Sequence, residues 1–96
     1  MAGSDDGVYA ISVAASMVSM EIQNLRVYER RGLLTPDRTS GGSRLYSDDD
    51  VMRLGRIRDL LAEGLNLVGI ARVLELEDEL DRLRAQLGEG QDEQSA

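Results

Sequence analysis

The 96-residue chain contains no cysteine and no histidine. Without cysteine it cannot form disulfides or thiolate metal sites, and it cannot sense redox state through a thiol. Without histidine it lacks the commonest general base and the commonest metal ligand. The sequence offers no pair of nucleophile and base and no phosphate-binding loop, so no catalytic residue is assigned and an enzyme is the least favoured class. We expect no metal and no cofactor.

Aromatic residues are scarce, with three tyrosines, no phenylalanine and no tryptophan. Aliphatic side chains therefore have to fill the core of what is expected to be one small domain. A core of this size leaves about 3–5 kcal/mol of stability, so a contribution from oligomerisation is favoured. No apolar run approaches the ~20 residues of a membrane span, and the acidic N-terminus does not resemble a signal peptide. We expect a cytoplasmic protein with no membrane partner.

The chain has no lysine, and its formal net charge is −7. This charge is unevenly distributed. Residues 26–46 hold five arginines against two acidic residues, a net charge of +3. Residues 73–96 hold two arginines against eight acidic residues, a net charge of −6. A basic middle section in an acidic protein is typical of a nucleic-acid-binding face, although the exclusive use of arginine is equally well explained by a GC-rich genome.

Two short helices are predicted after a disordered N-terminal tail at residues 1–9. Apolar residues recur at helical spacing in residues 11–18, where Ser12 is a candidate N-cap. They recur again in residues 22–31, and Gly32 is placed to end that second helix. Two short helices joined by a tight turn are the skeleton of a helix-turn-helix.

A hairpin and a third helix are predicted next along the chain. Gly41 and Gly42 lie between two short extended segments, which is a turn signal for a small two-stranded wing. Ser47 is followed by three aspartates, which resembles a capping box and favours the positive end of a helix. That helix is expected to end at Gly64.

The last predicted helix runs from Leu67 to Leu87, with Asn66 as its N-cap and Gly88 at its end. Its apolar residues recur at spacings of 3, 4, 3 and 4, a heptad pattern typical of a coiled coil. The alternative is a terminal helix that folds onto its own domain. Residues 88–96 are expected to form a disordered acidic tail. The predicted dimerisation residues are Val73, Leu76, Leu80, Leu83 and Leu87.

Several spaced motifs are similar to those of the MerR family of bacterial transcription regulators. Residues 25–38 have the sequence Leu-Arg-Val-Tyr-Glu-Arg-Arg-Gly-Leu-Leu-Thr-Pro-Asp-Arg, and Arg-Leu-Tyr follows at residues 44–46. Within this family, Val-Tyr-Ala-Ile-Ser-Val-Ala-Ala at residues 8–15 and Asn-Leu-Val-Gly-Ile-Ala-Arg-Val at residues 66–73 resemble the heat-shock repressors. The resemblance covers most of the chain and keeps the order of the motifs.

The resemblance implies a mainly α fold, with a winged helix-turn-helix at residues 10–72 and a coiled-coil dimerisation helix at residues 73–87. In such a domain the second helix enters the major groove and the wing lies on the flanking backbone. Amide side chains can pair with adenine, and arginine can reach guanine or phosphate. The predicted DNA-binding residues are Gln23, Asn24, Arg26, Tyr28, Arg30, Arg38, Ser43, Arg44 and Tyr46.

Two of these assignments have a structural alternative. Tyr28 is equally well explained as a core residue with its hydroxyl at the surface. Arg30, together with Arg31, is alternatively part of a solvated face that pairs with Glu29 or Asp37. Arg44 and Arg26 are the basic residues that the pattern favours most as DNA contacts.

Four positions depart from the family pattern. Ser19 occupies the turn position that usually holds glycine, and Glu21 replaces the usual small polar N-cap of the recognition helix. Val27 replaces an aromatic residue, and Leu45 replaces a frequent arginine or tyrosine of the wing. We therefore expect the DNA half-site to differ from that of the heat-shock repressors.

The sequence predicts a sequence-specific regulator that binds double-stranded DNA. The resemblance implies a homodimer that binds inverted repeats and represses stress or chaperone genes, with a chaperone as a candidate co-regulator. No effector-binding domain is expected after the last helix. The alternative class is a protein-interaction adaptor, similar to chaperone modulators, with a vestigial DNA-binding face. The glycine-rich wing and the retained Arg26 and Arg44 favour the DNA-binding function.

Overall fold

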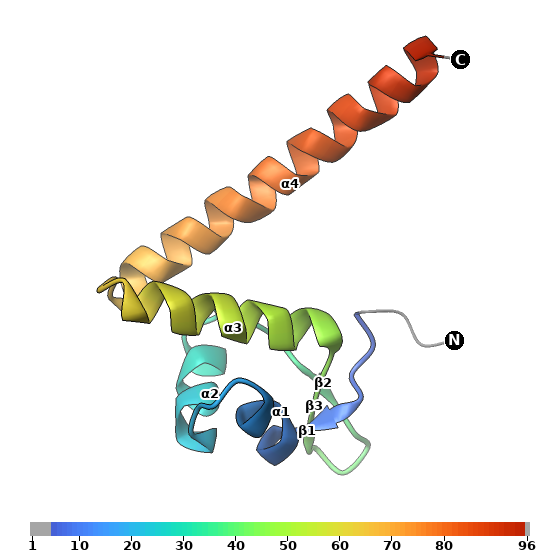
Figure 1. The fold of residues 1–96 in the computed structure, drawn as a ribbon. Helices are drawn as coiled ribbons and strands as arrows, with labels where there is room; N and C mark the ends of the chain where they lie inside the picture. The colour runs from blue at the N-terminus through green and yellow to red at the C-terminus, as the bar shows by residue number, and fades with distance from the viewer. Residues whose placement is uncertain (1–4, 96) are drawn as a thin grey trace. The chain divides into compact units, whose positions relative to one another are not determined.

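The computed structural model describes residues 5–95, and the side chains of residues 5–88. This part of the chain forms four helices and three short strands (Figure 1). The chain divides into two compact units, residues 1–64 and residues 65–96, and each is described by itself. Residues 1–4 of the predicted N-terminal tail, and Ala96 of the predicted C-terminal tail, lie outside the described residues.

The predicted helix-turn-helix is formed by α1 (Ile11–Met17) and α2 (Ile22–Arg30). Ser19, in the turn between them, has a φ of 56°, which is the left-handed region that favours glycine. The predicted N-cap role of Ser12 is wrong, because α1 already begins after Ala10 and Ser12 lies within its first turn.

The helix α3 (Asp48–Ala62) begins at the predicted capping box. The Ser47 hydroxyl accepts the backbone N–H of Asp50, and the Asp50 carboxylate accepts the backbone N–H of Ser47, each across 2.9 Å. Leu54 and Ile57 from this helix are fully buried. They join buried aliphatic residues of α1 and α2 in the core of the first unit, as the absence of phenylalanine and tryptophan requires.

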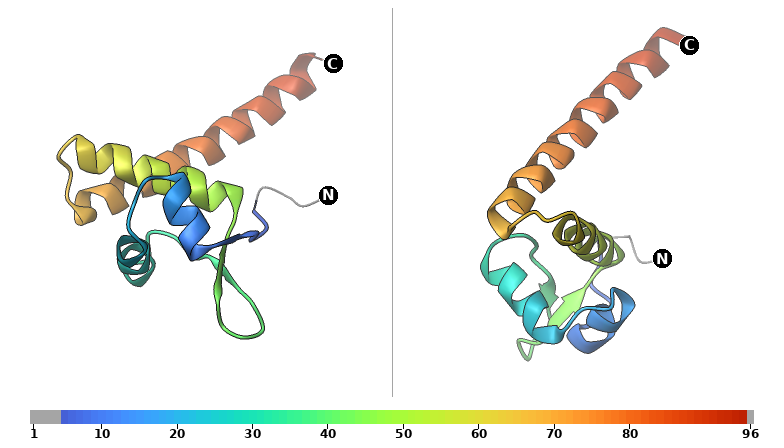
Figure 2. Two further views of the ribbon diagram at one scale, coloured as in Figure 1. Left: turned by 60° about the horizontal axis from the view of Figure 1, so that its bottom comes forward. Right: turned by 60° about the vertical axis from the view of Figure 1, so that its left-hand side comes forward.

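Two arginines of α3 hold the helix-turn-helix by its backbone. The Arg58 guanidinium donates through Nη1 to the carbonyl oxygen of Val18, the C-cap residue of α1, across 3.2 Å. The Arg53 guanidinium donates through Nε to the carbonyl oxygen of Leu33, just after α2. Helix α3 thus lies against the ends of both shorter helices (Figure 2), and a cation at the end of α1 also complements the helix dipole.

The three strands form one small antiparallel sheet with the order β1-β3-β2. The predicted hairpin consists of β2 (Asp37–Arg38) and β3 (Arg44–Tyr46). In its turn the Thr39 N–H donates to the Ser43 carbonyl oxygen across 2.8 Å. Gly42 has a φ of 87° there, a conformation that glycine adopts without steric cost.

The third strand, β1 (Tyr9–Ala10), was not predicted. Tyr9 lies opposite Tyr46 of β3, and the Val8 N–H donates to the Tyr46 carbonyl oxygen across 2.9 Å. The Tyr9 hydroxyl also donates to the Asp48 carboxylate across 2.6 Å. The prediction of a disordered tail over residues 1–9 is therefore wrong at Tyr9. A strand of two residues is too short to produce an alternating pattern.

The second unit consists of α4 (Leu67–Ser95) and the segment that leads into it. Asn66 caps this helix as predicted, because its side-chain oxygen accepts the Gly69 N–H across 2.8 Å. The predicted end at Gly88 is wrong, since the helix continues to Ser95. Gly88 does not adopt the left-handed conformation that ends helices, and a helical glycine costs only about 1 kcal/mol. The side chains of residues 89–96 lie outside the described part.

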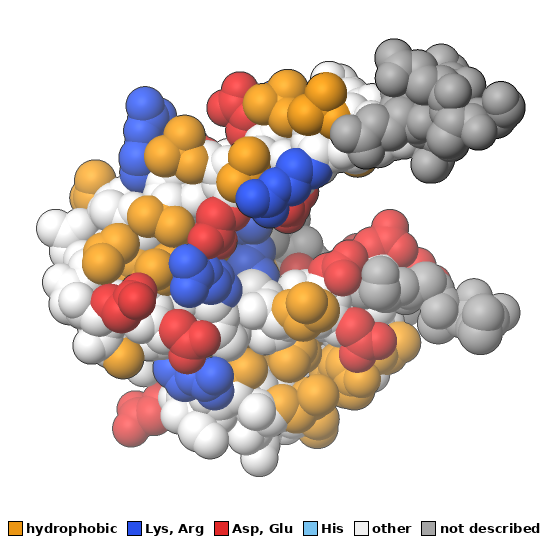
Figure 3. Space-filling model, turned by 45° about the horizontal axis from the view of Figure 1, so that its top comes forward, with side chains coloured by type: hydrophobic (Ala, Val, Ile, Leu, Met, Phe, Trp, Pro, Cys, Tyr) orange, Lys and Arg blue, Asp and Glu red, His pale blue; other side chains and the backbone are white. Residues whose placement is uncertain are grey.

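Hydrophobic side chains are exposed along α4 (Figure 3). They include four of the five predicted dimerisation residues, and between 45% and 66% of each is exposed. These four residues are Leu76, Leu80, Leu83 and Leu87. Val73, the fifth, is intermediate in exposure. Within residues 5–95, no helix has both the length and the apolar composition of a membrane span.

Candidate nucleic-acid interface

The solvent-facing side of α2 carries polar and basic side chains. Gln23, Arg26 and Arg30 are exposed, and their spacing of three and four residues places them on one face of the helix. Leu25 and Tyr28 are buried on the other side. This division fixes the rotation of α2 about its axis, so one amide and two guanidinium groups share the outer face.

The first turn of α2 is open to solvent. Glu21 is the N-cap residue, but its side chain forms no capping hydrogen bond. Gln23 and Asn24 follow it, and both are exposed. Two amides at the free end of a helix can form paired hydrogen bonds with adenine edges in the major groove.

The wing is joined to α2 through Glu29. One oxygen of the Glu29 carboxylate accepts Nε–H of Arg44 in β3. The other accepts Nη2–H of Arg38 in β2 across 2.8 Å. Arg38 also donates through Nη1 to the Gly42 carbonyl oxygen across 2.9 Å, which secures the turn of the hairpin. A single carboxylate therefore holds one arginine from each strand of the wing beside the helix.

The charges of this cluster determine its ionisation. Partial burial raises the pKa of the Glu29 carboxyl, but the hydrogen bonds and positive charges of Arg44 and Arg38 outweigh burial and lower the pKa overall. Glu29 is therefore ionised at neutral pH. Its side chain is 17% exposed, against 23% for Arg44 and 47% for Arg38. Arg38 and Arg44 both keep part of the side chain open to solvent.

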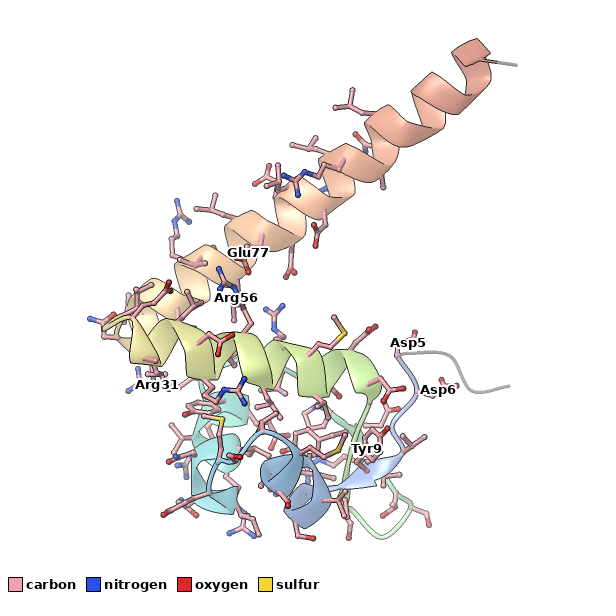
Figure 4. All side chains as sticks on the ribbon, viewed as in Figure 1. Asp5, Asp6, Tyr9, Arg31, Arg56 and Glu77 are labelled. Carbon is pink, nitrogen blue, oxygen red and sulfur yellow. The ribbon has the colours of Figure 1, made fainter. Side chains whose placement is uncertain are left out.

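The pairing of Glu29 differs from the alternative that the sequence offered. That alternative paired Glu29 with Arg30 or Arg31, whereas the structure pairs it with Arg38 and Arg44. Arg31 is the C-cap residue of α2 and lies at the end of the helix (Figure 4). Neighbours in sequence were the obvious partners, but only the folded hairpin brings the two wing arginines to the helix.

Two of the predicted contact residues are buried. Tyr46 is 0% exposed, and burial raises the pKa of its phenol. Its hydroxyl has no hydrogen-bond partner among the described residues. The prediction that this hydroxyl reaches DNA is therefore wrong for this conformation, because the β3 side chain points into the core. Tyr28 is 4% exposed, and burial also raises the pKa of its phenol, which favours its alternative assignment as a core residue.

Replacing Tyr46 with phenylalanine is expected to leave DNA binding unchanged and to raise the free energy of unfolding by up to about 1 kcal/mol, because it removes a buried hydroxyl that lacks a partner. Urea unfolding followed by circular dichroism measures the stability, and a mobility shift measures the binding. A loss of binding in a fully folded variant would return Tyr46 to the set of DNA contacts.

The remaining predicted residue, Ser43, is exposed in the turn of the wing, where its N–H donates to the Thr39 hydroxyl across 3.1 Å. Seven of the nine predicted DNA-binding residues are thus exposed or partly exposed. They are Gln23, Asn24, Arg26, Arg30, Arg38, Ser43 and Arg44. Glu29, which contacts both wing arginines, was not among the predicted residues. The only signal that could have identified it was an acidic residue within the basic section.

A polar helix face beside an arginine-bearing hairpin defines a winged helix-turn-helix, and comparison with known proteins identifies its family. Residues 9–77 match the MerR HTH family of regulatory proteins. The chain therefore belongs to the MerR HTH family.

Among its relatives is the heat shock protein HspR of Streptomyces coelicolor. It is 45% identical over 86 residues, which cover 88% of this chain and 57% of HspR. The chain spans little more than half the length of the curated relatives that it matches first.

Two solved structures of the family share the fold. A MerR-family transcriptional regulator from Bacillus cereus has a TM-score of 0.67 and 31% identity, covering 91% of this chain and 69% of that one. HiNmlR, a MerR family regulator that lacks the sensor domain, was solved bound to promoter DNA. It has a TM-score of 0.65 and 24% identity, covering 86% of this chain and 75% of that one.

Proposed function

We propose that the protein regulates transcription by binding double-stranded DNA with sequence specificity. The observation that carries the proposal is the outer face of α2, where Gln23, Arg26 and Arg30 lie together opposite the buried core. This helix enters the major groove, and its open first turn meets base edges. The DNA-binding unit comprises residues 10–72.

The wing contacts the flanking DNA backbone in this proposal. Arg44 and Arg38 lie beside α2 and keep part of their side chains exposed. Their contacts go to phosphate, so they contribute affinity for any sequence and also fix the register in which the amides and Arg26 meet the bases and distinguish between sequences. Ser43, in the exposed turn, adds a neutral hydrogen-bonding group to the same surface.

The active form is a homodimer held by residues 73–87 of α4. The leucines of the heptad pattern are exposed in the single chain, and a coiled coil with a second copy would bury them. We infer an antiparallel pair, in which the acidic residues between Glu75 and Asp81 of one copy can lie near Arg82 and Arg84 of the other. Two such units bind an inverted repeat.

The similarity to HspR supports a particular regulatory role. Because that relative is a heat shock protein, we assign to this chain the repression of stress or chaperone genes, with a chaperone as co-regulator. The protein acts in the cytoplasm, where the bacterial chromosome lies.

Selection from a pool of randomised DNA duplexes tests this function directly. The wild-type protein is expected to enrich an inverted repeat, here called the selected duplex, and to bind it more tightly than a shuffled duplex of the same composition. Affinity for both should fall steeply as salt rises, with a slope of about −0.9 per phosphate contact on logarithmic axes. Failure to enrich any sequence would overturn sequence-specific binding, and enrichment of a single half-site would contradict the dimer.

A further inference from the structure

We infer that Glu29 is a positioning residue for sequence discrimination: it holds the two wing arginines in register with the recognition helix, although its negative charge opposes DNA. The inference rests on the proposed function. Glu29 touches no DNA in this arrangement. It acts through Arg38 and Arg44, whose guanidinium groups it fixes relative to the outer face of α2.

The connectivity of the cluster supports this role. Glu29 belongs to α2, Arg38 to β2 and Arg44 to β3, so the carboxylate links α2 to both strands of a hairpin whose own pairing joins only β2 and β3. The Glu29 side chain is only 17% exposed, and its two oxygens bind different arginines. Charge-assisted hydrogen bonds of this kind are stronger than neutral ones, and partial burial protects them from solvent screening.

The contact also leaves Arg44 able to bind phosphate. Glu29 uses Nε–H of Arg44, and within residues 5–88 the terminal Nη groups of Arg44 have no hydrogen-bond acceptor. An arginine has many rotamers in solution, and one that is already fixed loses less entropy when it binds. Glu29 therefore orients a guanidinium whose terminal donors have no acceptor among the described residues.

Charge and positioning make opposite predictions for the loss of this carboxylate. If Glu29 only neutralises arginines, its removal should strengthen binding to every duplex, because the face becomes more positive. If Glu29 positions them, its removal should strengthen binding to shuffled DNA but weaken binding to the selected duplex. The ratio of the two dissociation constants therefore separates the two roles.

Glu29→Gln keeps the shape of the side chain and removes its charge, and Glu21→Gln is the matched control. Glu21 lies at the other end of α2, is exposed, and forms no side-chain capping bond. Both variants should bind the shuffled duplex more tightly than wild type. Only Glu29→Gln is expected to lower the ratio of specific to non-specific affinity, by about tenfold.

A double-mutant cycle distinguishes positioning from a general loss of structure. In a protein that already carries Arg38→Ala and Arg44→Ala, Glu29→Gln should have no further effect on the affinity ratio, because its partners are gone. An NMR signal from the Nε–H of Arg44 should exchange slowly with solvent in wild type and quickly in Glu29→Gln. If Glu29→Gln does not fold, Glu29→Asp keeps the charge with a shorter reach and is expected to lose part of the ratio.

An unchanged affinity ratio in folded Glu29→Gln, or a decrease that persists when both wing arginines are absent, would overturn the inference while leaving the proposed function intact. If the wild-type protein does not distinguish the selected duplex from the shuffled one, the proposed function fails first and this inference fails with it.

Discussion

Replacement of Leu83 by glutamate is expected to produce a monomer that binds the selected duplex at least about 100-fold more weakly than wild type. Leu83 lies in the heptad pattern of α4 and is 47% exposed in the single chain, so the pair of helices would bury it. A carboxylate buried there without a partner strongly disfavours association. A monomer then binds each half-site independently and loses the gain in affinity that comes from linking two DNA-binding units.

Ala85→Glu is the control for Leu83→Glu. Ala85 is exposed two residues further along the same helix and lies outside the heptad pattern, so this variant adds the same charge without touching the proposed seam. Light scattering should give a dimer for wild type and Ala85→Glu and a monomer for Leu83→Glu. Equal binding of Leu83→Glu and wild type to a single half-site would show that the DNA-binding unit remains folded. A dimer that persists in Leu83→Glu would contradict the assignment of the seam.

The helical part of the fold could be predicted because its signals are local. The apolar spacing that defines α1 and α2, and the Ser47 capping box, each depend on residues within one or two turns of each other. The glycine pair of the wing is equally local, since Gly42 adopts the left-handed conformation that a tight turn needs. Short-range sterics and local hydrogen bonds are therefore enough to predict these elements without knowledge of the tertiary packing.

The parts that the sequence did not predict depend on contacts between distant residues. Strand β1 exists because the Val8 N–H and Tyr9 meet Tyr46, 37 or more positions away in the chain. The direction of the Tyr46 side chain follows from the alternation of a strand whose register that same pairing sets. Glu29 finds its partners only when the hairpin closes. In each case the contact is made with a residue of another element, so no periodic pattern along the sequence indicates it.

For the candidate interface, the same distinction separates the helix from the wing. The outer face of α2 follows from spacing alone, so Gln23, Arg26 and Arg30 could be assigned from the sequence. The environment of the wing arginines could not, because a guanidinium that is half engaged by a carboxylate has the same sequence signature as a free one. This makes Arg26 the sharper test of base recognition, since the described residues include no ion-pair partner for it.

Arg26→Ala is expected to weaken binding to the selected duplex by roughly 5- to 150-fold, which corresponds to the loss of about 1–3 kcal/mol for one base contact. Binding to the shuffled duplex should fall only about twofold, because only one positive charge near the phosphates is lost. Arg31→Ala is the matched control: it removes the same charge from the C-cap of α2, away from the open first turn. It should weaken binding to both duplexes alike.

These expectations follow from what a guanidinium can recognise in each position. Beside a guanine edge its two parallel donors distinguish one base from the others, whereas beside a phosphate the same donors recognise charge only. Repeating the selection with Arg26→Ala should therefore relax the preference at one base pair in each half-site and leave the others unchanged. An equal loss on selected and shuffled duplexes, with an unchanged preference at every base pair, would place Arg26 on the phosphate backbone and leave recognition to the amides of Gln23 and Asn24.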